Sequence, residues 1–217
     1  MRLQNETQMP SRHPRGRVRS SPLIDPAVCC VLLLAPPEQA YQRLPQQVRS
    51  SFEGKVSALT AAAAIADVPV FVWWPGHDRQ AAASYLSPGA KYQHFAGGAQ
   101  ALPWLNSELA AGLDKEDRAD LLIGGFWLEY QVLATGLHAL ATGYDVYLLA
   151  DIARAQSPRA ASSTLQRLML QGARPALTSH VMHEWFLASA DDERARLHGL
   201  LEPVPWSDGD RGIGASP

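Results

Sequence analysis

Short unbroken apolar runs alternate along this chain with longer segments in which apolar residues recur at helical spacing. Four such runs cover residues 27–35, 68–74, 121–124 and 146–150. Continuous apolar runs of this length are typical of strands buried on both faces of a sheet. Two weaker segments, residues 91–95 and 174–177, fit short strands. The pattern therefore predicts a mainly parallel sheet of about six strands.

Helices are predicted between these strands. The clearest apolar stripe lies in residues 44–66, at Val48, Phe52, Val56, Leu59 and Ala63. Further helices are expected at residues 103–112 and 191–201. Another begins after Ser157, since serine is a common N-terminal cap, and another begins at Ser179. Strands that alternate with helices predict a three-layer αβα, Rossmann-like domain.

Several side chains are assigned to the core or to the surface by the same spacing. Residues 114–118 are charged and are predicted to form a solvated connection. The side chains expected to face inward in the two flanking helices are Trp104, Leu105, Leu109, Leu165, Leu168 and Met169.

The central segment, residues 119–152, is predicted to be one strand–helix–strand unit. Its first strand ends at Gly124 and Gly125, its helix covers residues 129–142, and Gly143 follows as a C-terminal cap. In such parallel units ligands bind where strand carboxyl ends meet helix amino ends. Any chemistry is therefore expected first on residues 125–131.

The length and the hydrophobic fraction of the chain fit a single domain with one core. The chain has 217 residues, of which 47% are hydrophobic, and a net charge of −2. We expect an α/β domain over residues 23–202, with disordered tails at residues 1–22, which are rich in arginine, and 203–217.

The net charge of −2 favours neither nucleic acid nor an anionic membrane as a partner. No apolar run reaches the roughly 20 residues that span a bilayer, so we expect a cytoplasmic protein.

The central segment resembles a known family in its spaced landmarks. They are Gly125, Leu128, Gln131, Val132, Gly143, Tyr144, Val146 and Asp151, and the likeness continues through residues 166–168, 172–175 and Glu184. The sequence is similar to that of the isochorismatase-like cysteine hydrolases over about residues 27–188. The turn Phe126-Trp127-Leu128-Glu129-Tyr130-Gln131 resembles the Leu-Trp-Thr-Glu-x-Cys turn of one subgroup. The resemblance implies the αβα fold, a small-molecule ligand and a homo-oligomer; we expect no cofactor.

The same resemblance implies that the catalytic triad is not intact. The family nucleophile is a cysteine at the helix start, where this chain has Gln131, and the family aspartate falls at Ala35. A carboxamide cannot form a covalent thioester, and alanine cannot accept a proton. The family lysine or arginine has Lys91 as its nearest candidate, although the register between residues 91 and 104 stays open.

Other polar and aromatic residues are candidates for the pocket. Besides Gln131 they are Trp73, Trp74, His94, Trp127, Leu128 and Glu129. Glu129 is open to two interpretations, a carboxylate that caps the helix and fixes the turn, or a group in the pocket. His180, His183 and Glu184 lie close together in sequence but lack further ligands, so we expect no metal site.

Three hypotheses about function follow. The first is a hydrolase fold that has lost cysteine catalysis and acts as a small-molecule-binding or oligomer-partner pseudoenzyme. The second is an active hydrolase of a small amide or ester, in which Glu129, Lys91 or His94 activates water without a covalent intermediate. The third is a structural protein whose own side chains, such as Leu128, Trp127 and Trp73, fill the pocket.

Overall fold

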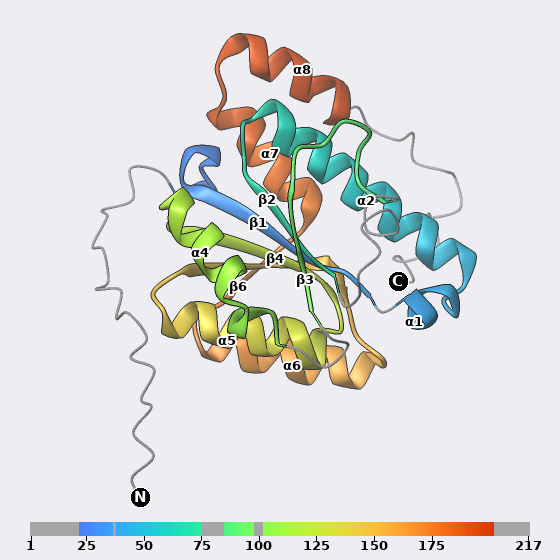
Figure 1. Ribbon diagram of the computed structural model, residues 1–217. Coiled ribbons are helices and arrows are strands. Elements are labelled where there is room, and N and C mark those ends of the chain that lie inside the picture. The colour runs from blue at the N-terminus through green and yellow to red at the C-terminus, as the bar shows by residue number, and fades with distance from the viewer. Residues whose placement is uncertain (1–21, 37, 75–84, 98–101, 202–217) are drawn as a thin grey trace, which may run out of the picture.

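Six parallel strands form the centre of the molecule. The computed structural model describes residues 22–36, 38–74, 85–97 and 102–201. The strand order in this part of the chain is β3-β2-β1-β4-β5-β6, and all five pairings are parallel (Figure 1). The strands are β1 (Cys29–Leu34), β2 (Val70–Trp74), β3 (Gln93–Ala96), β4 (Asp120–Phe126), β5 (Asp145–Arg154) and β6 (Arg174–Ala176). The predicted parallel sheet of about six strands is confirmed.

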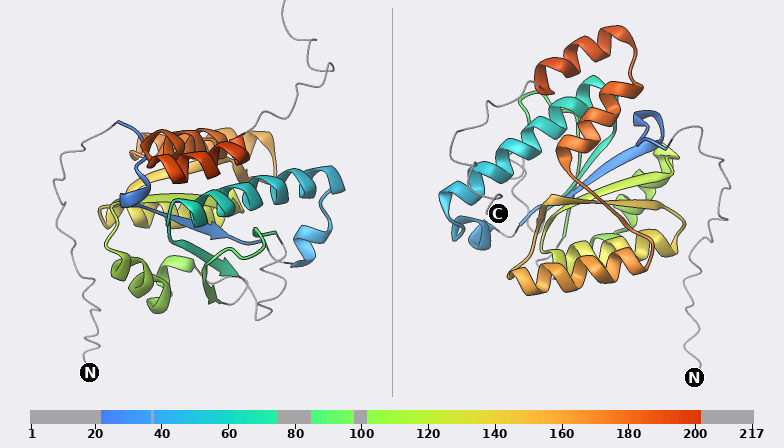
Figure 2. Two further views of the ribbon diagram at one scale, coloured as in Figure 1. Left: turned by 90° about the horizontal axis from the view of Figure 1, so that it is seen from above. Right: turned by 180° about the vertical axis from the view of Figure 1, so that it is seen from behind.

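Helices cover both faces of this sheet and give the expected three layers. The helices are α1 (Glu38–Gln42), α2 (Gln46–Ile65), α4 (Ser107–Glu116), α5 (Leu133–Ala141), α6 (Pro158–Leu170), α7 (Thr178–Ala188) and α8 (Asp191–Leu201). Three shorter helical turns are η1 (Pro26–Val28), η2 (Pro103–Leu105) and the π-type turn η3 (Leu128–Val132). Helices α2, α7 and α8 pack on one face, and α4, α5 and α6 pack on the other (Figure 2).

Local signals place the ends of several elements. The Ser157 side chain accepts a hydrogen bond from the Ala160 amide at 3.2 Å, so α6 begins with the expected serine cap. Gly143 follows α5 with φ 91°, a conformation that favours glycine at a helix end. In the described ranges no helix combines the length and the apolar character needed to cross a membrane.

The predicted bounds of α4, the predicted connection at residues 114–118 and the inward positions of Leu105 and Met169 are wrong. The Asn106 side chain accepts from the Leu109 amide at 2.8 Å and starts α4 there, so the helix continues to Glu116 through the charged segment. Leu105 therefore lies before the helix and is 64% exposed. Met169 is 51% exposed, because its neighbour Leu168 takes the buried position in the last turn of α6.

Some predictions fall outside the described residues. These are the two predicted tails, except for Pro22.

Strands β1 and β4 come unusually close at their carboxyl ends. Leu34 pairs with Gly125, which has φ 124°. A Cβ atom at residue 125 would collide with the backbone carbonyl of Leu34. Glycine is therefore required here for two reasons, the close approach and the positive φ.

We expect Gly125→Ala to lower the free energy of unfolding by about 3 kcal/mol or more, because both the contact and the backbone conformation oppose a side chain. Urea denaturation followed by circular dichroism measures the change. Gly54→Ala is the matched control, since a Cβ atom at this position of α2 would meet nothing within 4 Å. It should raise stability by about 0.5–1 kcal/mol. Equal stabilities of the two variants would contradict the argument.

Candidate functional site

The carboxyl ends of the strands gather at one edge of the sheet, called here the carboxyl edge. It contains the ends of β1 at Leu34, of β2 at Trp74, of β3 at Ala96, of β4 at Phe126 and of β5 at Arg154. Ala35 follows β1, is 1% exposed, and its amide donates to the Trp73 carbonyl at 2.9 Å. Gln131 lies in η3, directly after β4. Because β1 and β4 are neighbours, Ala35 and η3 belong to the same edge.

The turn from β4 into η3 is built around Trp127. The peptide bond between Phe126 and Trp127 is cis. The Trp127 carbonyl accepts from the amides of Tyr130 at 3.1 Å and Val132 at 3.2 Å, and thereby starts the helical turn. Leu128 is buried in the core. Gln131 thus sits in the first helical turn after a strand, the place where free backbone amides favour an anion.

Glu129 joins this turn to the segment after β5. Its Oε1 atom accepts a hydrogen bond from the Gln156 amide at 2.9 Å. Its Oε2 atom is buried and has no hydrogen-bond partner among the residues that the structure describes. The first contact is the one expected of a carboxylate that fixes the turn.

Aromatic rings fill the α2 side of the carboxyl edge. The Phe126 ring lies 5.0 Å from Phe52, 5.2 Å from Trp127 and 6.2 Å from Tyr41, centroid to centroid. Tyr85 extends the group to Phe52 at 5.7 Å and to Trp74 at 6.2 Å. Sequence reasoning missed Tyr41, because it lies in the five-residue helix α1, which is too short to show an apolar stripe. It also missed Tyr85, which lies outside any regular element.

The two tryptophans at the end of β2 both pack in the core. Trp73 is 1% exposed and lies on the α4 and α5 face, whereas Trp74 is 3% exposed and lies on the α2 face. His94 pairs with Val72 within the sheet. Lys91 is exposed and precedes β3 by two positions, on the side of the amino end of that strand. The structure therefore does not bring Lys91 close to Ala35 and Gln131.

Asp151 was only a landmark of the family resemblance, yet it holds α7 in place. Its carboxylate accepts from the Thr178 amide at 3.0 Å and from the Thr178 hydroxyl at 2.7 Å. Lys55 of α2 lies 3.5 Å from the same carboxylate. A carboxylate at the amino end of a helix is stabilised by the helix dipole. Asp151 thus orients the helix that follows β6.

The two cysteines lie at the other end of β1. Cys29 and Cys30 are its first residues, and they are 0% and 1% exposed. Burial raises the pKa of the Cys29 thiol, and the nearby Cys30 and Asp120 act in the same direction. A buried neutral thiol is a poor nucleophile. Across the described ranges, no group of three or more His, Cys, Asp or Glu residues is arranged to hold a metal ion.

Comparison with known proteins gives matches to solved structures. No family model and no curated protein matches the chain. Among the solved structures, YcaC from Pseudomonas aeruginosa, with hexane-2,5-diol and covalent acrylamide, has a TM-score of 0.68 at 19% identity over 84% of this chain and 94% of its own. The MAR1 ribonuclease from Caenorhabditis elegans has a TM-score of 0.71 at 14% identity, and the match covers 89% of this chain and 100% of that one.

YcaC from Escherichia coli, described as an octameric hydrolase of unknown specificity, has a TM-score of 0.66 at 18% identity over 85% of this chain and 93% of its own. Isochorismatase-like proteins and a cysteine hydrolase also match. The chain therefore has the α/β fold of the isochorismatase-like hydrolases, as its landmarks indicated.

We expect both thiols to resist a disulfide reagent in the native protein, because burial makes both inaccessible and keeps the Cys29 thiol neutral. Absorbance with Ellman's reagent measures the reaction. The same protein unfolded in guanidinium chloride is the control, and both of its cysteines should react as soon as the reagent is added. Rapid reaction of either thiol in the native protein would show that the start of β1 is open.

Proposed function

We propose that this protein is an isochorismatase-like fold that has lost cysteine-nucleophile catalysis and binds a small molecule as a pseudoenzyme. One observation carries the proposal. The first helical turn after β4 holds Gln131, and Ala35 follows the neighbouring strand β1. These are the positions that the family resemblance assigns to the cysteine and the aspartate.

The chemistry of the two side chains supports this proposal. A carboxamide neither ionises nor forms a thioester, and a methyl group takes no proton. No other thiol can substitute, since Cys29 and Cys30 lie at the opposite end of β1. Members of a catalytic triad act as a unit, so the loss of one removes most of the rate enhancement.

The placement of the other candidates weakens the alternative, hydrolysis by activated water. Lys91 precedes β3 and His94 is its second residue, so neither lies at the carboxyl end of β3. Glu129 does lie at the carboxyl edge, where its Oε1 atom accepts from the Gln156 amide, whereas its Oε2 atom has no partner among the described residues but is buried away from solvent water. A general base needs a free lone pair within reach of the water that it activates.

The proposal also covers the assembly of the protein and the compartment in which it resides. Escherichia coli YcaC, which shares the fold, is described as an octamer. Tyr130, next to Gln131, is 57% exposed, and an aromatic side chain of this kind is common at subunit interfaces. The two buried free cysteines fit a reducing compartment such as the cytoplasm. We therefore propose a cytoplasmic homo-oligomer.

We expect the wild-type protein to show no turnover on a panel of small amides, small esters and isochorismate. In contrast, Gln131→Cys should form a single covalent adduct with acrylamide, because the helix start lowers the pKa of a thiol placed there. Intact-mass spectrometry followed by peptide mapping measures the adduct.

Wild type and Gln131→Ser are the matched controls, and neither should be modified under native conditions. The variant Ala35→Asp/Gln131→Cys then tests whether an added base speeds alkylation. Turnover of any panel member by the wild-type protein would overturn the loss of catalysis. Failure of acrylamide to reach residue 131 would show that side chains fill the pocket and would overturn small-molecule binding at this edge.

A further inference from the structure

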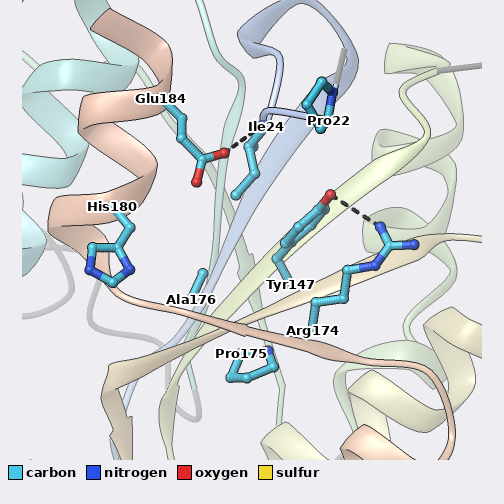
Figure 3. A pocket seen from close by; sticks show the side chains of 8 residues that line it. All are labelled: Pro22, Ile24, Tyr147, Arg174, Pro175, Ala176, His180 and Glu184. Carbon is cyan, nitrogen blue, oxygen red and sulfur yellow. Dashed lines mark hydrogen bonds between the residues drawn. The ribbon is translucent and has the colours of Figure 1, made fainter. Parts of the chain in front are cut away.

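A cavity lies away from the carboxyl edge, beside β6 at the end of the sheet. Its volume is about 400 Å³, and Figure 3 shows the side chains around it. The residues that matter here are Ile24, Tyr147, Arg174, Ala176, His180 and Glu184. Tyr147 lies seven positions before the end of β5, so this cavity belongs to the half of the sheet where strands begin.

The cavity arises because β6 is short and stands at the sheet edge. Only Arg174, Pro175 and Ala176 pair with β5, at Tyr147, Leu148 and Leu149. Helix α7 then crosses the face of these two strands, and the segment at Ile24 closes one side (Figure 3). A cavity of this size is at the lower end of the range of small-ligand sites, which is about 300–1,000 Å³.

One wall carries an oriented guanidinium group. An Nη1 atom of Arg174 donates to the Tyr147 hydroxyl at 3.1 Å, and its Nη2 atom lies 3.3 Å from Asp145 Oδ1. The guanidinium carbon also lies 5.5 Å from the centre of the Tyr147 ring. These contacts fix the plane of the group but use few of its five N–H donors. Donors therefore remain for a carboxylate, which arginine can bind through two parallel hydrogen bonds.

The facing wall carries an oriented carboxylate. The Oε2 atom of Glu184 accepts from the Ile24 amide at 2.6 Å, which holds the side chain of α7 against the N-terminal segment. The second oxygen points away from Ile24 (Figure 3). A carboxylate has about four acceptor positions, so it can bind an ammonium group while it keeps the amide. His180 lies one helical turn before Glu184 and adds a further polar group on the same wall.

Apolar surface separates the two charged groups. Ile24 is 3% exposed and Tyr147 is 6% exposed, and Pro175 and Ala176 of β6 complete this surface. A ligand with one charge would use only one of these walls, although the two walls carry opposite charges. A ligand with a charge of each sign at its two ends satisfies both walls.

We propose that this cavity binds a small zwitterionic molecule of the amino-acid class. Its carboxylate pairs with Arg174, its ammonium group pairs with Glu184, and its aliphatic body lies against Ile24 and Ala176. The proposal adds a second binding site to the protein and does not depend on residues 35 and 131.

The test is isothermal titration calorimetry of the full chain with a series of ω-amino acids of increasing length: β-alanine, γ-aminobutyrate and ε-aminocaproate. Caproate and hexylamine, which carry one charge each, are the matched probes. At least one amino acid should bind saturably, and it should bind about tenfold or more tightly than either matched probe, because each charged wall contributes a charge-assisted hydrogen bond.

Arg174→Gln and Glu184→Gln should each weaken that binding by about tenfold or more, since each removes one charge–charge contact. Glu184→Gln retains an oxygen that can accept from the Ile24 amide, so the fold should persist. Arg159→Gln is the control, because Arg159 is exposed on α6, on the other face of the sheet. It should bind as the wild type does.

Three results would overturn the proposal: no saturable binding by any amino acid of the series, equal binding of the single-charge probes, or unchanged affinity in both glutamine variants. The outcome is separate from the loss of catalysis proposed above, because it is measured on the wild-type chain by heat and not by turnover.

Discussion

The close contact between β1 and β4 at their carboxyl ends determines the geometry of the whole edge. Gly125 faces the Leu34 carbonyl, and a Cβ atom at Gly124 would lie 2.7 Å from the Ile152 side chain of β5. Two successive glycines therefore let β4 fit tightly between both neighbours. The chain leaves the sheet immediately afterwards, through Phe126 and Trp127, and η3 begins there. Leu128, Glu129 and Gln131 take their positions from this exit.

Carboxylates hold the distant segments together. Glu129 accepts from the Gln156 amide, Asp151 from the Thr178 amide, and Glu184 from the Ile24 amide. In each case an acidic side chain satisfies a backbone N–H that no strand or helix ladder uses, and such a charged hydrogen bond is stronger than a neutral one. Acidic residues near a strand end or helix start can thus be structural. For Glu129 this contact is the physical reason to favour turn fixing over catalysis.

Much of the architecture could be predicted from local signals, and the misses have local causes. Strands β1, β2, β4 and β5 are long apolar runs with buried residues, so their existence followed from the pattern. Helix α1 has only five residues and gives no periodic signal. Helix α4 began later than expected because Asn106 caps it, and a cap depends on a single side chain whose partner is not visible in the periodicity.

The sequence by itself determined the order of the main strands and helices along the chain, the parallel sheet, and the residue types at positions 35 and 131. These features depend on apolar spacing and on residue identity, which are local properties. Only the tertiary structure decided that Lys91 lies before β3 and not at its carboxyl end, and that Glu129 contacts Gln156. The same holds for the cavity that joins Ile24, Tyr147, Arg174 and Glu184. Such contacts depend on strand register and on long-range packing, because groups far apart in sequence become neighbours only when the helices pack against the sheet.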